Sequence, residues 1–243
     1  MHSGAQAMSY RGVRMVGIMN TPDQRKGRRC PAVLFLHGLP GAEKSVDVQR
    51  ELMARGVASF APHFCGAWGS EGYYTVSGLV PQAEAALRFL SRRPFVDPKR
   101  LGVYGFSMGG WAAIHLAAAT PALRAAVAVA PVGGPEMVGP GLDAAMARFA
   151  RIVRAKSAPA LAQDFISSVR RLDPAESAAR LKSPLLLIHG SSDQTVPSSV
   201  SERILRAAGG RARLIRVSGA EHDLLDRRPW LARTVTRWFV DRL

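Results

Sequence analysis

A serine stands between two glycines in the stretch Gly105-Phe106-Ser107-Met108-Gly109. A serine at a sharp strand-to-helix turn has its hydroxyl lifted clear of the backbone, which is the position that a nucleophile requires. The flanking residues fit such a turn, because a strand-like run ends at Tyr104 and helix-forming residues follow from Gly110. The glycines leave space that a Cβ atom would fill. We therefore predict that Ser107 is a nucleophile for acyl-transfer chemistry.

A serine hydroxyl is a weak nucleophile and needs a general base, which is usually a histidine. Three histidines follow Ser107 in the chain, at positions 115, 189 and 222. His115 lies within the helix that follows the turn and points away from its start, and His189 ends an apolar strand, where we expect a structural role. His222 lies in a loop between the last expected strand and the last expected helix. A histidine in such a loop can reach toward a serine, so we predict that His222 is the base.

The base needs a carboxylate to orient its ring, and three aspartates compete for this role. Asp193 follows an apolar strand and precedes a helix that begins near Pro197. Asp223 and Asp226 lie close to His222 in the sequence, and such neighbours point poorly at the far ring nitrogen. We therefore predict Asp193 as the acid, in the chain order Ser, Asp, His that hydrolases with this turn use.

Two backbone amides are expected to hold the negative charge that develops during acyl transfer. One is the amide of Met108, directly after the nucleophile, and the other is the amide of Leu39 in the loop after the strand that ends at Leu36. We expect four side chains near these loops to border the substrate pocket: His37, Phe64, Trp68 and Val132.

Apolar strand-like runs alternate with helical runs along the chain, which predicts an α/β fold with a mostly parallel sheet covered on both faces. Ligands bind such sheets at the carboxyl ends of the strands. We expect one domain over residues 1–243, with residues 1–9 flexible. The expected strands are 11–20, 32–36, 57–62, 100–104, 125–130, 184–189 and 212–217, and the expected helices are 45–55, 77–92, 107–119, 197–208 and 229–242.

Residues 133–182 interrupt this alternation with two apolar stripes at helical spacing. The first stripe includes Met146 and Phe149, and the second includes Leu161 and Phe165. They predict either two helices packed on the domain or a helical cap over the active site. We favour the cap, because the segment lies between two strands at the catalytic edge of the sheet.

The charge and cysteine content of the chain indicate which kinds of binding partner and which cell compartment to expect. The chain has 33 Lys and Arg against 18 Asp and Glu, a net charge of +15. The arginines are spread over helices and loops without a long basic run, so we expect no nucleic-acid partner. No signal peptide or membrane-spanning run is expected, and two separated cysteines favour a reducing, cytoplasmic location. We expect no metal and no organic cofactor. Both a monomer and a homodimer remain open.

Together these residues resemble the α/β-hydrolase superfamily. The resemblance rests on His37-Gly38, on the turn around Ser107, on the run from His189 to Pro197, and on Glu221-His222. It is strongest to the group of dienelactone hydrolases, small esterases and prolyl-oligopeptidase catalytic domains. This resemblance implies a central sheet of about eight strands with a small helical cap. That group often carries an acidic or Asn residue and an Arg where His63 and Cys65 stand here.

The resemblance implies a serine hydrolase that acts through an acyl-enzyme, with a small acyl ester as substrate. The alternative substrate is a short peptide or amide, and a non-catalytic binding protein on the same fold is a third alternative. The intact set of Ser107, Asp193 and His222 disfavours the third alternative.

Overall fold

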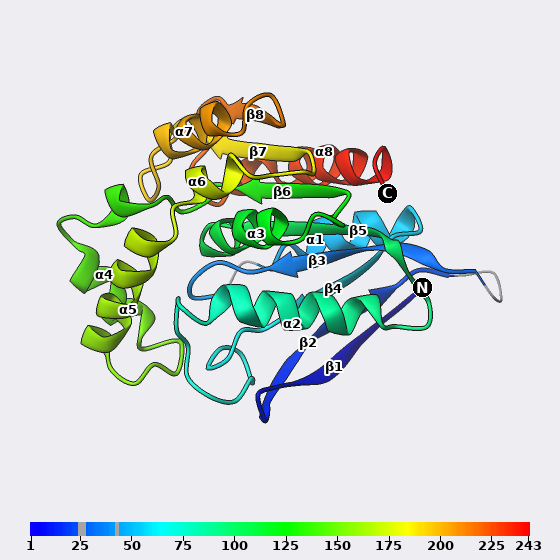
Figure 1. The fold of residues 1–243 in the computed structure, drawn as a ribbon, viewed down its shortest axis with the longest axis horizontal. Helices are drawn as coiled ribbons and strands as arrows, with labels where there is room; N and C mark the ends of the chain where they lie inside the picture. The colour runs from blue at the N-terminus through cyan, green and yellow to red at the C-terminus, as the bar shows by residue number, and fades with distance from the viewer. Residues whose placement is uncertain (24–27, 42–43) are drawn as a thin grey trace.

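A single eight-stranded sheet runs through the molecule in the order β1-β2-β4-β3-β5-β6-β7-β8. The computed structural model describes residues 1–23, 28–41 and 44–243 (Figure 1). The pairs β1-β2 and β2-β4 are antiparallel and the other neighbours are parallel. The strands are β1 (His2–Tyr10), β2 (Val13–Thr21), β3 (Cys30–Leu36), β4 (Ala58–Pro62), β5 (Val96–Phe106), β6 (Ala125–Val129), β7 (Leu185–Gly190) and β8 (Ala212–Val217).

Two layers of helices cover the two faces of this sheet. The helices α2 (Leu79–Ser91), α3 (Met108–Ala119) and α7 (Ser199–Ala207) lie on the near face in Figure 1, and α1 (Val46–Ala54) and α8 (Arg228–Val240) lie on the far face. Successive side chains of a strand point to opposite faces, so each apolar strand serves both layers. In β3, for example, Leu34 packs in one core and Phe35 in the other. The predicted α/β fold with a mostly parallel sheet is confirmed.

The N-terminal segment is not the flexible tail that we expected for residues 1–9. His2–Tyr10 forms strand β1 at the edge of the sheet, in continuous register with β2 from His2 opposite Thr21 to Tyr10 opposite Val13. Arg11 and Gly12 connect the strands, both with positive φ, as a tight two-residue hairpin turn requires. The sequence of β1 is small and polar because only Met8 is buried, so an apolar pattern could not reveal the strand.

Residues 133–182 form a helical excursion between β6 and β7. It contains η1 (Pro135–Met137), α4 (Leu142–Phe149), α5 (Ala158–Arg171) and α6 (Pro174–Ala178). The helices α4 and α5 coincide with the two apolar stripes and lie beyond the carboxyl ends of the strands (Figure 1). Backbone hydrogen bonds join the excursion to the loop after β4, from Tyr74 N to Arg154 O at 2.8 Å and from Arg154 N to Gly66 O at 2.7 Å. The excursion is therefore attached at the edge where ligands bind this class of sheet.

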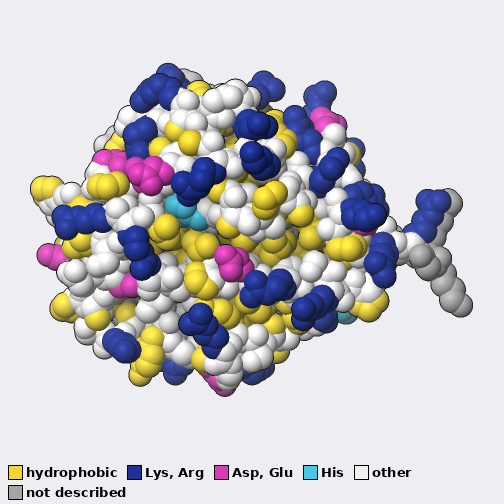
Figure 2. Space-filling view, viewed as in Figure 1, with side chains coloured by type: hydrophobic (Ala, Val, Ile, Leu, Met, Phe, Trp, Pro, Cys, Tyr) yellow, Lys and Arg dark blue, Asp and Glu magenta, His cyan; other side chains and the backbone are white. Residues whose placement is uncertain are grey.

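The surface carries its excess of positive charge in a dispersed form. Figure 2 shows Lys and Arg side chains spread over one face, with acidic and apolar side chains between them. Among the described helices, none combines the length and the apolar character that crossing a bilayer requires.

Candidate active site

The turn between β5 and α3 holds Ser107 in a conformation that few residues adopt. Ser107 has φ 53° and ψ −118°, which places a non-glycine residue at positive φ. A Cβ on Gly105 would lie 2.0 Å from the carbonyl oxygen of Gly109, and a Cβ on Gly109 would lie 2.1 Å from the carbonyl oxygen of Leu36. Only glycine fits at these two positions, because backbone atoms occupy the space. Such strain at a serine between two glycines is typical of a functional turn.

The structure brings Ser107, His222 and Asp193 into one hydrogen-bonded chain. Ser107 Oγ lies 3.0 Å from His222 Nε2, and His222 Nδ1 lies 2.7 Å from Asp193 Oδ2. A carboxylate oxygen only accepts, so Nδ1 carries the proton and Nε2 is free to accept the serine hydroxyl proton. The Phe106 ring packs against the His222 ring, with 5.0 Å between their centroids. The base is therefore held in the tautomer that proton abstraction from Ser107 requires.

Hydrogen bonds join the loop that carries Asp193 to the loop that carries His222. Ser192 N donates to Ala220 O at 3.0 Å, and Gly219 N donates to Ser191 Oγ at 2.9 Å. A Cβ on Gly190 would lie 2.2 Å from Ala220 O, so glycine is needed where the end of β7 meets the loop after β8. These contacts hold the loop of Asp193 next to the loop of His222.

The Asp193 carboxylate is fully buried and receives hydrogen bonds at both oxygens. Oδ1 accepts from the amides of Thr195 and Val196, each at 2.8 Å. Burial alone would raise the pKa of Asp193, but hydrogen bonds from His189, His222 and the Val196 amide outweigh it and hold the pKa well below its usual range. The low pKa favours the ionised form of Asp193 at neutral pH.

The competing aspartates do not orient the base. The Asp223 carboxylate accepts from Leu225 N at 3.3 Å, and the exposed Asp226 pairs with Arg227 at 3.6 Å. The ring of His222 instead contacts Asp193. This geometry favours Asp193, as the position of the three residues in the sequence suggested.

The loop and the helix that carry the two predicted amide donors both lie next to Ser107. Met108 is the first residue of α3, and the first amides of a helix have no partner within the helix. The loop that carries Leu39 is close as well, because a Cβ on Gly38 would lie 3.1 Å from Ser107 Cβ. Within residues 28–41 and 44–243, neither the Leu39 nor the Met108 amide donates to another protein group. Both donors are therefore available to a substrate oxygen.

Two of the four predicted pocket residues are packed in the protein. Phe64 has 0% of its surface exposed, and its ring lies 4.8 Å from the ring of His37. His37 accepts from Phe64 N through Nε2 at 3.1 Å and donates through Nδ1 to Gly38 O at 2.7 Å. Both side chains are therefore enclosed by neighbours, and their place beside a substrate pocket stays a prediction. Burial lowers the pKa of His37 to about 4, so the ring is neutral and structural.

The other two pocket candidates differ in exposure, because Val132 is buried and Trp68 lies on the surface. The Trp68 side chain is 45% exposed, and its Nε1 donates to Pro40 O at 2.9 Å. The amide of Val132 donates to the carbonyl oxygen of Ser107 at 3.2 Å. One candidate thus lies on the surface beside the Leu39 loop, and the other lies directly behind the nucleophile.

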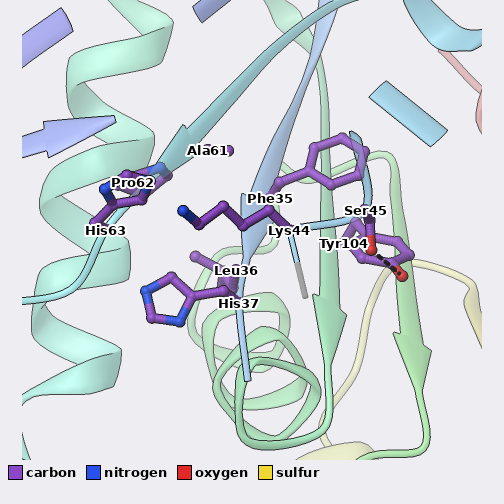
Figure 3. A pocket seen from close by; sticks show the side chains of 9 residues that line it. All are labelled: Phe35, Leu36, His37, Lys44, Ser45, Ala61, Pro62, His63 and Tyr104. Atoms are coloured by element: carbon purple, nitrogen blue, oxygen red, sulfur yellow. Dashed lines mark hydrogen bonds between the residues drawn. The ribbon is translucent and has the colours of Figure 1, made fainter. Parts of the chain in front are cut away.

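A small cavity of about 10 Å³ is lined by residues at the ends of β3 and β4, a volume on the order of one water molecule. Figure 3 shows the Lys44 side chain reaching between the rings of His37 and His63, among the residues that line the cavity. Burial lowers the pKa of both Lys44 and His63. Ser107 is not among the lining residues, so this cavity is separate from the nucleophile. Among the described residues, no group of three or more His, Cys, Asp or Glu side chains is arranged to hold a metal ion.

The sequence analysis missed one neighbour of the site, His189. Its ring is fully buried, and Nε2 lies 3.2 Å from Asp193 Oδ2. Spacing offered a signal, since His189 is the penultimate residue of β7 and Asp193 follows it by four residues.

Comparison with known proteins identifies the family. A model of the prolyl oligopeptidase family matches residues 48–243. The chain belongs to the prolyl oligopeptidase family. The match includes Ser107, Asp193 and His222, whereas the Leu39 loop precedes it.

Known proteins of several bacteria are similar to this chain. An uncharacterized protein of Mycobacterium tuberculosis is 31% identical over 205 residues, which is 83% of this chain and 67% of that protein. A Methylorubrum extorquens protein named as a carboxymethylenebutenolidase is 27% identical over 76% of this chain, and the match spans 60% of its own length. The solved structure of Est1E from Butyrivibrio proteoclasticus has a TM-score of 0.77 at 17% identity, with 98% of each chain covered.

The family and the fold together define the class of enzyme. This member of the prolyl oligopeptidase family is a serine hydrolase. The predicted resemblance to dienelactone hydrolases, small esterases and prolyl-oligopeptidase catalytic domains is confirmed.

Proposed function

We propose that this chain hydrolyses small or medium carboxylic esters, with Ser107 as nucleophile, His222 as general base and Asp193 as the carboxylate that orients it. The observation that supports the proposal most is the continuous path from Ser107 Oγ through the His222 ring to Asp193, with distances of 3.0 Å and 2.7 Å. Such a path activates the Ser107 hydroxyl because His222 Nε2 can accept its proton. The imidazolium that results is stabilised by the negative charge of Asp193.

The first half of the reaction makes an acyl-enzyme. Ser107 Oγ attacks the ester carbonyl carbon while its proton moves to His222 Nε2. The carbonyl oxygen becomes an oxyanion, which the amides of Leu39 and Met108 stabilise. The bond from carbon to the leaving oxygen then breaks, and His222 Nε2 gives its proton to that oxygen, so that an alcohol leaves.

The second half regenerates the enzyme. Water attacks the acyl carbon while His222 Nε2 takes its proton, and the same two amides hold the new oxyanion. The bond to Ser107 Oγ breaks, and the proton returns from His222 to the serine as the carboxylic acid leaves. His222 carries every transferred proton, so the scheme uses no metal and no organic cofactor.

We propose that Trp68 and Val132 border the acyl pocket and that residues 133–182 act as a small cap over it. The position of α4 and α5 at the carboxyl edge of the sheet supports the cap (Figure 1). The exposed indole of Trp68, beside the Leu39 loop, supports a contact with the substrate at the rim.

Peptide hydrolysis is the second candidate, because the family model that matches the chain is that of the prolyl oligopeptidases. The test compares the hydrolysis of a panel of p-nitrophenyl esters of increasing acyl length with that of aminoacyl p-nitroanilides. Ester turnover well above anilide turnover supports the esterase. The reverse order would assign the chain to the peptidases, and no turnover of either series by folded protein would contradict a hydrolase acting through Ser107.

A further inference from the structure

A second histidine contacts the carboxylate that the proposed function assigns as the catalytic acid. His189, the penultimate residue of β7, lies with Nε2 3.2 Å from Asp193 Oδ2, the same oxygen that faces His222 Nδ1 at 2.7 Å. Both His189 and the Asp193 carboxylate are fully buried. The titratable side chains that face this carboxylate are thus His189 from β7 and His222 from the loop after β8.

The neighbours of His189 determine where its proton lies. Nε2 faces two groups that only accept, namely Asp193 Oδ2 and the carbonyl oxygen of Val196 at 2.9 Å. Nε2 therefore carries a hydrogen and shares it between them. Nδ1 lies 2.7 Å from the hydroxyl of Ser201 on α7, and this hydroxyl donates to the neutral ring. The ring is thus locked at both nitrogens.

Each acceptor of the His189 proton belongs to the turn that presents Asp193. Val196 donates its own amide to Asp193 Oδ1 at 2.8 Å, so a ring that holds the Val196 carbonyl also holds this amide in place. The same N–H contacts Oδ2 directly. His189 therefore fixes the carboxylate from two sides, through the oxygen that meets His222 and through the backbone that meets the other oxygen.

We propose that His189 is a positioning residue of the active site, which holds the Asp193 carboxylate in line with His222 and shares its negative charge. The inference rests on the proposed function, in which Asp193 orients the base. His189 does not touch the substrate or a reacting atom; it acts through Asp193. It differs from an ordinary buried histidine, because its Nε2 contacts the Asp193 carboxylate, to which the proposed reaction assigns a role.

The chain offers a matched control in His115. This ring is also buried, and its Nδ1 lies 2.7 Å from a serine hydroxyl, that of Ser177. Its Nε2 has no hydrogen-bond partner within the described residues. Both histidines are thus buried and contact a serine hydroxyl, but of the two only His189 contacts the Asp193 carboxylate.

The test compares four proteins: wild type, His189→Leu, His189→Gln and His115→Leu. Leucine removes the donor at similar volume, whereas the Gln amide can offer an N–H near the place of Nε2. With a p-nitrophenyl ester, we expect His189→Leu to lose about 10- to 100-fold in kcat with little change in KM, the range for one hydrogen bond to a buried charge. We expect His189→Gln to recover a large part of this loss and His115→Leu to stay within about threefold of wild type.

The pH profile separates positioning from a loss of general stability. Without the His189 donor, the Asp193 charge acts more strongly on the His222 imidazolium, so the acid limb of kcat/KM should move to higher pH. It should return toward the wild-type position in His189→Gln and stay in place in His115→Leu. A folded His189→Leu variant with wild-type kcat and an unmoved acid limb overturns the inference.

One measurement on the wild-type protein needs no variant to fold. In ¹⁵N-histidine NMR spectra, His189 should carry its proton on Nε2 at neutral pH, and its signals should shift when Ser107 is phosphonylated, while those of His115 should not. A proton on Nδ1 would overturn the proposal. A wild-type protein without ester turnover would instead contradict the proposed function, so the two failures are distinguishable.

Discussion

Replacing Asp193 with Asn tests the hydrogen-bond geometry of the site most sharply. The carboxylate faces four N–H groups: Oδ1 accepts from the amides of Thr195 and Val196, and Oδ2 lies next to His222 Nδ1 and His189 Nε2. An Asn side chain has one oxygen and one NH₂ group. In either orientation the NH₂ group replaces an oxygen that now faces N–H groups, so two donors face each other. The substitution changes no volume, and its effect therefore comes from the hydrogen bonds alone.

Each orientation of the Asn carries a definite cost. If NH₂ faces the backbone, both amide bonds to Oδ1 are lost. If NH₂ faces the histidines, His222 must move its proton to Nε2, and it can then no longer accept the proton of Ser107. Two hydrogen bonds to a buried charge correspond to about 3–6 kcal/mol, or a loss of about 10²- to 10⁴-fold in kcat.

The assay is steady-state turnover of a p-nitrophenyl ester by Asp193→Asn, with Asp223→Asn as the control. Asp223 contacts only a nearby backbone amide in the described structure, so we expect its variant to stay close to wild type. An Asp193→Asn variant within about threefold of wild type, or a damaging Asp223→Asn, would refute the assignment of the acid.

The depressed pKa of Asp193 also predicts how acid affects stability. A carboxylate with a lowered pKa in the folded state stabilises the protein above its unfolded pKa of about 3.9. This stabilisation is lost progressively as the pH falls below that value toward the folded pKa. Thermal unfolding from pH 7 down to pH 3 should therefore show a steeper decline for wild type than for Asp193→Asn, which has no charge to lose at this position. Equal slopes would contradict the low pKa.

The remaining predictions concern the nucleophile, the turn and the excursion. Ser107→Ala and His222→Ala should each lower ester turnover by about 10³-fold or more while circular dichroism stays unchanged; an active His222→Ala would show that another base serves. Gly109→Ala should reduce soluble yield and Tm, because its Cβ would lie 2.1 Å from Leu36 O; a wild-type Tm would contradict that packing. Arg203→Ala should lower the unfolding free energy by about 1–2 kcal/mol, because Arg203 ties α7 to two carboxylates of the excursion; an unchanged denaturant midpoint would oppose this.

The parts of the fold that were predictable are those whose burial leaves a mark in the sequence. Central strands such as β3 and β7 are continuous apolar runs because both of their faces are covered. Edge strand β1 leaves no such mark, because backbone pairing with β2 holds it and only Met8 is buried. A pattern of side chains cannot report a strand that is held mainly by its backbone.

The same distinction applies to the site. Ser107, Asp193 and His222 were predictable because their chemistry demands fixed residue types on fixed loops. The packing of Phe64 against His37 and Tyr74 could not be predicted, because a ring next to such a loop faces inward or outward according to its neighbours. His189 was judged structural, since its contact with Asp193 depends on the shape of one tight turn.

Labelling with a fluorophosphonate, located by peptide mass spectrometry, tests the central claim most directly. The account predicts one modified residue, Ser107, in wild-type protein, and labelling that is lost in Ser107→Ala and strongly slowed in His222→Ala. The reagent reacts with a serine only where a base and oxyanion donors activate it. Folded wild-type protein that stays unlabelled at Ser107, or carries the label on another residue, would contradict the account.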